Sequence, residues 1–264
     1  MPATPAPFAL FERSALLPLH EGGRRLPCAL SMVAAPLAVL EGVAPDTLSP
    51  EEADLLTDGF APARRQSFLA GRRAAKNALG FLAPESSARE IRILPGLLQQ
   101  PVVHVPGRSN LQVTLAHAGM AAFAIAHPEA CPMGVDLERA APDQLSALRA
   151  QTTPREWALA RSALPGDDAG RLLQLWCLKE ALSKALRCGL TMPFSLLEAR
   201  TLTALPGGVR ARFENFAQYE GIALHAAPFC LAVVQPHTAR WESLEGGMPP
   251  HPLREWLGEI AALG

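Results

Sequence analysis

The sequence predicts an α+β fold made of two similar α/β halves related by a pseudo-twofold axis. Each half is expected to pack a helix on a small, mostly antiparallel sheet. The chain has 264 residues, enough for one large domain or for two halves of ordinary size. In both halves a long helical pattern is followed by short apolar runs that Gly and Pro separate. This shared order of elements, without obvious residue identity, indicates a duplicated unit.

The N-terminal half is predicted to span residues 1–128. A first strand is expected at residues 26–35. Ser49-Pro50-Glu51-Glu52 is a capping box with proline at the first helical position, so a helix is expected to start there. A longer helix is predicted over residues 62–81, with an apolar side and a basic side that includes Arg73 and Lys76. Four short strands are then expected at residues 90–94, 102–105, 111–117 and 121–127.

The C-terminal half is predicted to span residues 129–240, and residues 241–264 form an extension with an amphipathic helix. Thr153-Pro154-Arg155-Glu156 repeats the capping pattern and starts another helix. The next helix is expected at residues 170–187, with Gly189 as the residue that stops it. Strands are predicted before and after these helices, at residues 133–138, 196–205, 209–213, 222–226 and 229–234.

Composition disfavours several classes of protein. Hydrophobic residues make up 49% of the chain and the net charge is −1, which argues against a disordered chain and against a nucleic-acid partner. The five cysteines show no metal-ligand spacing, which fits a reducing cytoplasm. The longest apolar run, residues 28–40, contains Pro36 and is too short to span a bilayer. We therefore expect a soluble, cytoplasmic monomer without a membrane partner.

Lysine is rare and unevenly placed. Of the 24 basic residues only three are lysine, and Lys179 and Lys184 share one short window. Arginine evidently serves wherever a generic positive charge suffices. This window is therefore expected to need a compact ammonium group instead of a planar guanidinium.

Asp136 and Glu138 form the first candidate site. They lie two apart in a predicted strand, so both side chains leave the same side of the sheet. A half-exposed surface strand is the ordinary interpretation of such a pattern. Like charges on one face repel unless a cation intervenes, and Mg²⁺ is commonly held by a few carboxylates together with substrate phosphates. The pair therefore favours a hard divalent cation.

Glu180 and Lys184 form the second candidate site, four residues apart on a predicted helix. The plain alternative is an exposed ion pair that stabilises the helix by a few tenths of a kcal/mol. Trp176 lies one turn earlier on the same stripe, which indicates a partly buried cleft. Three carboxylates, a divalent cation and two lysines together suit a pyrophosphate whose charge shifts during a reaction.

His117 and three arginines are further candidates. His117 ends a predicted strand, and Arg64, Arg65 and Arg72 lie on the basic side of the helix at residues 62–81. A structural histidine and an ordinary solvated helix face are the plain alternatives, and the pattern alone favours the solvated face. As functional groups, these side chains would donate hydrogen bonds to a phosphate.

Two motifs resemble the hallmark motifs of the 4′-phosphopantetheinyl transferases. Gly134-Val135-Asp136-Leu137-Glu138 is similar to GVD(I/V)E, and Trp176 to Lys184 reads as W-x-x-K-E-A-x-x-K. Phe68-Leu69-Ala70-Gly71-Arg72 resembles the AGR segment of the long, pseudo-dimeric class that serves surfactin and enterobactin synthesis. Thr114-Leu115-Ala116-His117 resembles the S-x-S-H strand of that class. The resemblance covers roughly residues 60–235.

The resemblance implies an enzyme with its active site between the halves. Such enzymes transfer the phosphopantetheine of coenzyme A to a serine of an apo acyl or peptidyl carrier protein and release adenosine 3′,5′-bisphosphate. Coenzyme A is then a substrate, Mg²⁺ the cofactor and Mn²⁺ an alternative ion. The carrier proteins served by the family belong to fatty-acid, polyketide or nonribosomal-peptide biosynthesis.

The family's motifs also imply roles for individual residues. The residues expected to hold the metal ion are Asp136, Glu138 and Glu180. The residues expected to contact coenzyme A are Arg64, Arg65, Arg72, His117, Lys179 and Lys184. The expected catalytic residues are Glu180 and Lys184, and Lys184 would steady the leaving phosphate and return its proton.

Glu180 has two conceivable roles in this scheme. A carboxylate bound to Mg²⁺ is stabilised in its ionised form and is a weaker base for it. We therefore expect Glu180 to be a ligand first and to deprotonate the carrier serine through a bound water, with direct abstraction as the second choice. Two other functions stay open: a coenzyme A- or carrier-binding protein without turnover, and a Mg²⁺-dependent pyrophosphate hydrolase.

Overall fold

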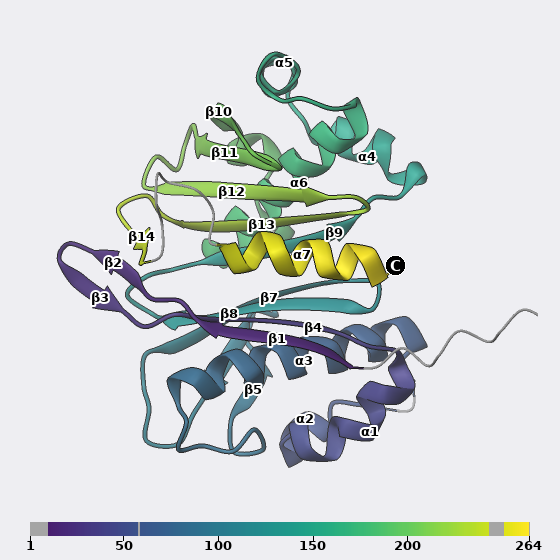
Figure 1. Cartoon of the computed structure of the whole chain (residues 1–264), viewed down its shortest axis with the longest axis vertical. Helices are drawn as coiled ribbons and strands as arrows, with labels where there is room; N and C mark the ends of the chain where they lie inside the picture. Colours follow the sequence, from purple (N-terminus) through teal and green to yellow (C-terminus); the bar gives the residue numbers. More distant parts are fainter. Residues whose placement is uncertain (1–9, 58, 243–250, 264) are drawn as a thin grey trace, which may run out of the picture.

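The structure, a computed structural model, describes residues 10–57, 59–242 and 251–263 (Figure 1). Two antiparallel sheets lie next to each other, each with a long helix on one face. Helix α7, yellow in Figure 1, runs across the region where the two sheets meet. The predicted α+β class is confirmed.

The N-terminal sheet has four strands in the order β1-β4-β8-β7, and all neighbours are antiparallel. Helix α3, Pro62–Leu82, packs on β4, β8 and β7, and α1, Leu37–Thr47, packs against α3. The predicted helix at residues 62–81 is therefore confirmed. The bounds of the strands are Phe11–Leu16 for β1, Ala29–Ala34 for β4, Leu111–Ala118 for β7 and Ala121–Pro128 for β8.

The C-terminal sheet has five strands in the order β10-β11-β12-β13-β9, again antiparallel throughout. Helix α6, Asp168–Ala185, packs on β9, β13 and β12. Helices α4, Leu145–Ala150, and α5, Pro154–Ala163, lie beside α6. The strands are β9 Gly134–Arg139, β10 Ala199–Leu205, β11 Gly208–Phe213, β12 Tyr219–Ala226 and β13 Phe229–Pro236.

Smaller elements complete the fold. A hairpin is formed by β5, Arg92–Pro95, and β6, Pro101–His104. A three-stranded sheet brings β14, late in the chain, next to β2 and β3 near its beginning. In this sheet β14 pairs with β2, and β2 pairs with β3. The remaining bounds are β2 Leu19–Glu21, β3 Arg24–Leu26, β14 Arg240–Trp241, α2 Pro50–Ala53, α7 His251–Leu263 and the 3-10 turns Pro142–Gln144, Gly189–Thr191 and Phe194–Leu197.

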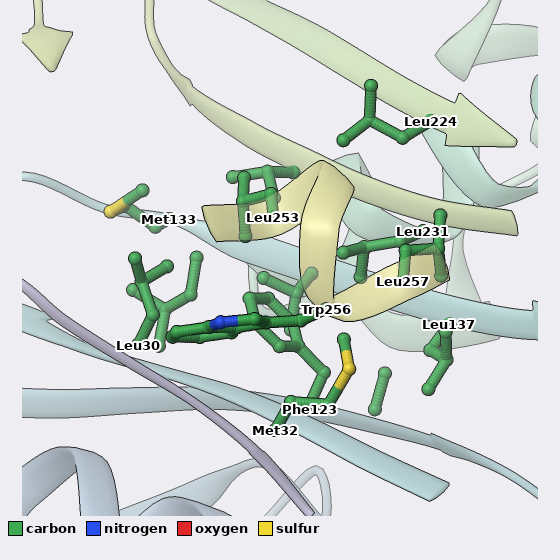
Figure 2. Packing of buried hydrophobic residues seen from close by; sticks show 14 of the residues in the cluster. Leu30, Met32, Phe123, Met133, Leu137, Leu224, Leu231, Leu253, Trp256 and Leu257 are labelled. Atoms are coloured by element: carbon green, nitrogen blue, oxygen red, sulfur yellow. The ribbon is translucent and has the colours of Figure 1, made fainter. Parts of the chain in front are cut away.

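The two sheets meet at their edge strands β7 and β9. The backbone N–H of Val135 donates to Oγ1 of Thr114 at 3.1 Å across this junction. Figure 2 shows the hydrophobic cluster beneath α7, where Trp256 packs with Phe123 of the N-terminal sheet and Leu231 of the C-terminal sheet. The predicted C-terminal helix is confirmed, and its apolar face closes a core that both sheets share.

A buried glutamate–lysine pair connects the elements around α3. Glu52 is 0% exposed and forms an ion pair with Lys76, which is 2% exposed. Glu52 also accepts a hydrogen bond from the backbone N–H of Ile93 at 3.0 Å. The ammonium of Lys76 donates to the carbonyl of Thr47 at 2.7 Å. The expectation of a solvated basic face is therefore wrong at Lys76, which ties α3 to α2 and β5.

The C-terminal half contains the same pair. Glu156 is 0% exposed and pairs with Lys179, which is 2% exposed. Glu156 accepts from the backbone N–H of Ala199 at 3.1 Å, and Lys179 donates to the carbonyl of Gln151 at 2.8 Å. In each half the glutamate is the third helical residue after a Ser or Thr cap, and the carbonyl acceptor lies two residues before that cap. This repetition supports the duplicated unit that the shared plan predicted.

Some boundaries differ from the predictions. Helix α2, which begins at its predicted capping box, is only one turn long. Helix α6 ends at Ala185, and the first left-handed residue after it is Arg187, with φ 56°, two residues before the expected Gly189. Strand β1 and helix α1 had no clear periodic signal and were not predicted. Within the described residues, no helix has the length and apolar character needed to cross a membrane.

Gly134 sets the closest contact between β9 and α6. A Cβ atom added at this position would lie 1.9 Å from the carbonyl oxygen of Ala181 and 2.6 Å from the backbone nitrogen of Ala185. Both neighbours are backbone atoms of α6, so they cannot rotate away as a side chain would. The glycine of the Gly134-Val135-Asp136-Leu137-Glu138 motif therefore allows the strand to touch the helix.

We expect Gly134→Ala to lower the free energy of unfolding by roughly 2 kcal/mol or more, because the methyl group must push β9 away from α6. Urea denaturation measures this change. Gly80→Ala in α3 is the matched control, since nothing lies within 4 Å of its added Cβ. That control should gain about 0.5–1 kcal/mol from higher helix propensity. Equal stability of Gly134→Ala and the unmodified protein would contradict the close backbone contact.

Candidate functional site

A cavity of about 690 Å³ lies between α3 and β7 on one side and the end of α6 on the other, next to the β5–β6 hairpin. Its volume is within the usual range for ligand pockets. None of the described residues that line it is acidic. The basic residues in its wall are Arg64, Arg72, His117, His127, Lys184 and Arg187. A concave wall with charges of one sign favours a polyanionic ligand.

Apolar side chains from both halves form another part of the wall. They include Phe68, Leu94, Leu115 and Met133. A ligand with several anionic groups and a flat or apolar part would find partners for both in this cavity.

The predicted carboxylates lie side by side beyond Lys184. Asp136 is 5% exposed on β9, and Glu138 is half-buried two residues later on the same face. Lys184 on α6 places its Nζ 2.8 Å from Oδ1 of Asp136, and because it also lines the cavity it connects the two regions. The indole Nε1 of Trp176 donates to Oε1 of Glu138 at 3.2 Å. The predicted shared faces on the strand and on the helix are therefore present.

Burial and the nearby charge of Asp136 raise the pKa values of Glu138 and Glu180. Burial raises the pKa of Glu180 to about 7, with a further contribution from the negative charge of Asp136, while Lys184 opposes the shift. Burial and Asp136 also raise the pKa of Glu138, against the hydrogen bond from Trp176. Like charges in a partly buried site cannot all ionise without a compensating cation.

These carboxylates have the chemistry of a Mg²⁺ site. All are hard oxygen donors, and Oδ2 of Asp136 is buried without a hydrogen-bond partner. Within the described part of the chain, however, no three His, Cys, Asp or Glu side chains are arranged as a preformed metal site. Lys184 instead pairs with Asp136. The donor set fits Mg²⁺, and binding would require Asp136 and Lys184 to rearrange.

Lys179 was predicted to bind the ligand, but in the structure it lies outside the cavity. It is 2% exposed, is not part of the cavity wall, and uses its ammonium for Glu156 and the carbonyl of Gln151. Consecutive residues on a helix point about 100° apart, so Lys179 leaves α6 on a different side from Glu180. The expectation that Lys179 contacts phosphate is therefore corrected to a structural role.

The predicted arginines divide into two groups. Arg72 and Arg64 line the cavity, and each guanidinium lies over an aromatic ring, Phe68 at 4.6 Å and Phe60 at 4.7 Å. Arg65 is outside the cavity wall and forms an ion pair of 2.6 Å with Glu41. Only the first two are therefore placed to reach a ligand in the cavity.

His117 lies in the cavity wall as predicted. Desolvation by the surrounding protein lowers its pKa, and the positive charge of Lys184 lowers it further. A bound phosphate would raise the pKa again, since the protonated imidazole gains an ionic hydrogen bond.

Two basic residues of the cavity were missed by the sequence reasoning. Arg187 follows the W-x-x-K-E-A-x-x-K motif and has a left-handed backbone, with φ 56°, a conformation that usually favours glycine. His127 is 3% exposed, and burial lowers its pKa to about 4, so it is neutral at physiological pH. The sequence signal available for Arg187 was a basic residue just after the motif. No such signal in the sequence marked His127.

The fold and the site define an α+β protein with a basic cavity wall beside a cluster of carboxylates. Residues 132–234 match the family model of the 4′-phosphopantetheinyl transferase superfamily. The match includes β9 and α6 and therefore both sequence motifs. This part of the chain is therefore similar in sequence to that superfamily.

One similar solved structure is a holo-(acyl-carrier-protein) synthase from Bacillus anthracis str. Ames in complex with CoA (3′,5′-ADP). The two chains share 19% sequence identity, and the superposition has a TM-score of 0.33. It covers 43% of this chain and 97% of the synthase. No curated protein sequence matches the chain.

The raised pKa of Glu180 predicts a pH-dependent stability in metal-free protein. Because the folded-state pKa of about 7 exceeds the ordinary value of 4.5, the stabilisation is complete below pH 4.5 and is lost as the pH rises through 7. Glu180→Gln cannot ionise and should escape this loss. After allowance for solvent screening, its advantage over the unmodified protein should grow by about 1 kcal/mol between pH 5 and pH 8.

Urea denaturation in the presence of EDTA measures the effect. Glu129→Gln serves as the control, since Glu129 is exposed and away from the carboxylates. Parallel pH profiles for Glu180→Gln and the unmodified protein would contradict the raised pKa.

Proposed function

We propose that this protein is a Mg²⁺-dependent 4′-phosphopantetheinyl transferase of the long, pseudo-dimeric class. It would transfer phosphopantetheine from coenzyme A to a serine of an apo acyl or peptidyl carrier protein and release adenosine 3′,5′-bisphosphate. One observation carries the proposal. Lys184 pairs with Asp136, one of the carboxylates in the superfamily's motifs, and it also lines a cavity whose charged wall residues are all basic.

Coenzyme A has the chemistry that this cavity favours. Its pyrophosphate and 3′-phosphate are anionic, and its adenine ring is flat. Arg64, Arg72 and His117 in the N-terminal half of the wall would bind the 3′-phosphate. Arg187 and Lys184, at the end of α6, would face the pyrophosphate. The proposed coenzyme A site therefore uses both halves of the chain.

The carboxylates would hold the metal ion. Asp136, Glu138 and Glu180 are the proposed ligands. A bound cation would compensate the burial and repulsion that raise the pKa values of Glu138 and Glu180, and it would give the buried Oδ2 of Asp136 a partner. When bound, Mg²⁺ neutralises charge on the pyrophosphate and polarises its oxygens. Lys184 would release Asp136 and place its ammonium against the leaving phosphate, to which it returns a proton.

Proton transfer from the carrier serine would involve Glu180. In the reaction a bond forms between the serine oxygen and the β-phosphorus of coenzyme A, and the bond from that phosphorus to the bridging oxygen breaks. The serine proton passes to Glu180 through one water, since a ligating carboxylate is a weak direct base. The electron pair of the broken bond leaves with adenosine 3′,5′-bisphosphate.

Mass spectrometry tests the proposal directly. The protein is incubated with coenzyme A, Mg²⁺ and each of several apo carrier proteins, and the carriers should gain the mass of one phosphopantetheine. Absence of the gain on every carrier would refute the transferase function. Release of adenosine 3′,5′-bisphosphate without a carrier would indicate a hydrolase. Binding of coenzyme A with neither product would indicate a binding protein without turnover.

Arg187 allows stability and ligand binding to be separated. Arg187→Gly relieves the left-handed backbone and should raise the free energy of unfolding by about 1 kcal/mol. The same change removes a cation from the cavity wall and should weaken coenzyme A binding by about tenfold. Urea denaturation and isothermal titration calorimetry measure the two effects. Undiminished affinity in Arg187→Gly would exclude Arg187 from the binding site.

A further inference from the structure

Glu52 is a buried carboxylate outside the cavity, and several elements fix its position. Its Oε1 accepts from the backbone N–H of Ile93 on β5 at 3.0 Å, and its Oε2 accepts from the backbone N–H of Ser49 at 2.9 Å. The ammonium of Lys76 on α3 also binds this carboxylate. With 0% exposure and partners from three segments, the carboxylate has little freedom to move.

Arg72 brings a fourth partner to this carboxylate. Its Nε lies 3.2 Å from Oε1 of Glu52, and its guanidinium lies 4.6 Å from the centre of the Phe68 ring. The side chain is 12% exposed and forms part of the cavity wall. The carboxylate forms an ion pair with the inner nitrogen, without a hydrogen bond of standard geometry, and the ring covers one face of the guanidinium. The two terminal nitrogens are then the donors left for a ligand.

The C-terminal half shows what the buried pair needs for its structural role. Glu156 and Lys179 repeat the ion pair, the contact with a strand N–H and the contact with a carbonyl that Glu52 and Lys76 make, without the further N–H that Ser49 gives to Glu52. Arg72 lies four residues before Lys76, and the position four residues before Lys179 is Leu175, which is 1% exposed. The structural pair therefore works without an arginine. Arg72 is an additional group of the N-terminal half, whose helix α3 lines the cavity.

We propose that Glu52 is a positioning residue for ligand binding, which acts by holding Arg72 in place to bind a phosphate group. The identification of the ligand as coenzyme A rests on the proposed function. An arginine that is already ordered loses less conformational entropy when its ligand binds. Glu52 thus raises affinity without touching the ligand.

The test compares two variants that both lack the buried ammonium. Lys76→Met keeps the ion pair between Glu52 and Arg72, and the double variant Lys76→Met with Glu52→Gln removes the negative charge of that pair without leaving a lysine unpaired. Calorimetry with coenzyme A should show about tenfold weaker binding for the double variant than for Lys76→Met. Urea denaturation verifies that both are folded under the conditions of the titration.

Two further comparisons separate positioning from a general loss of structure. Glu156→Gln breaks the equivalent pair of the C-terminal half, so it should lower stability while its affinity for coenzyme A stays within about twofold. In an Arg72→Ala background, adding Glu52→Gln to Lys76→Met should change affinity by less than about twofold, because the group through which Glu52 acts is gone.

The possible outcomes distinguish this inference from the proposed function. Equal affinity of Lys76→Met and the double variant would overturn the positioning role, even if the unmodified protein binds coenzyme A and transfers phosphopantetheine. A loss that persists in the Arg72→Ala background would overturn it as well, since Glu52 would then act by another route. An unmodified protein that binds no coenzyme A would overturn both proposals.

Discussion

The backbone contact between β9 and α6 at Gly134 is the constraint on which the candidate site depends. It brings Asp136 and Glu138 of the strand against the part of the helix that carries Glu180 and Lys184, although the two segments lie far apart in the sequence. The resulting ion pair between Lys184 and Asp136, at 2.8 Å, links the carboxylates to the cavity. A side chain at position 134 would collide with the backbone of α6, since its Cβ would lie 1.9 Å from the carbonyl oxygen of Ala181.

The charged groups on the two sides of Lys184 are opposite in sign, and each set lacks counter-charges when no ligand is bound. On one side, partly buried carboxyl groups have raised pKa values because burial and mutual repulsion oppose their ionisation. On the other side, basic residues from α3, β7 and the end of α6 surround the cavity. A divalent cation with a polyanionic substrate would satisfy both sides, which is the physical basis of the proposed function.

Local sequence patterns predicted those parts of the molecule that depend on local geometry. The capping box at Ser49, the helix start at Thr153, the alternation of Asp136 and Glu138, and the spacing of Glu180 and Lys184 all follow from local helix and strand geometry. The burial of Lys179 was missed because it depends on the distant Glu156, which α5 brings against α6. Arg187 was missed because a left-handed arginine ended the helix where glycine was expected.

The central claim is that β9 and α6 together form one divalent-cation site. The most direct test is a titration of Mn²⁺ into the protein in the presence of coenzyme A, with electron paramagnetic resonance to measure free Mn²⁺. The expected result is one bound ion per chain, with binding at least about tenfold weaker in Asp136→Asn, which removes the most buried of the three proposed ligands. Equal Mn²⁺ binding by Asp136→Asn and the unmodified protein would contradict the site.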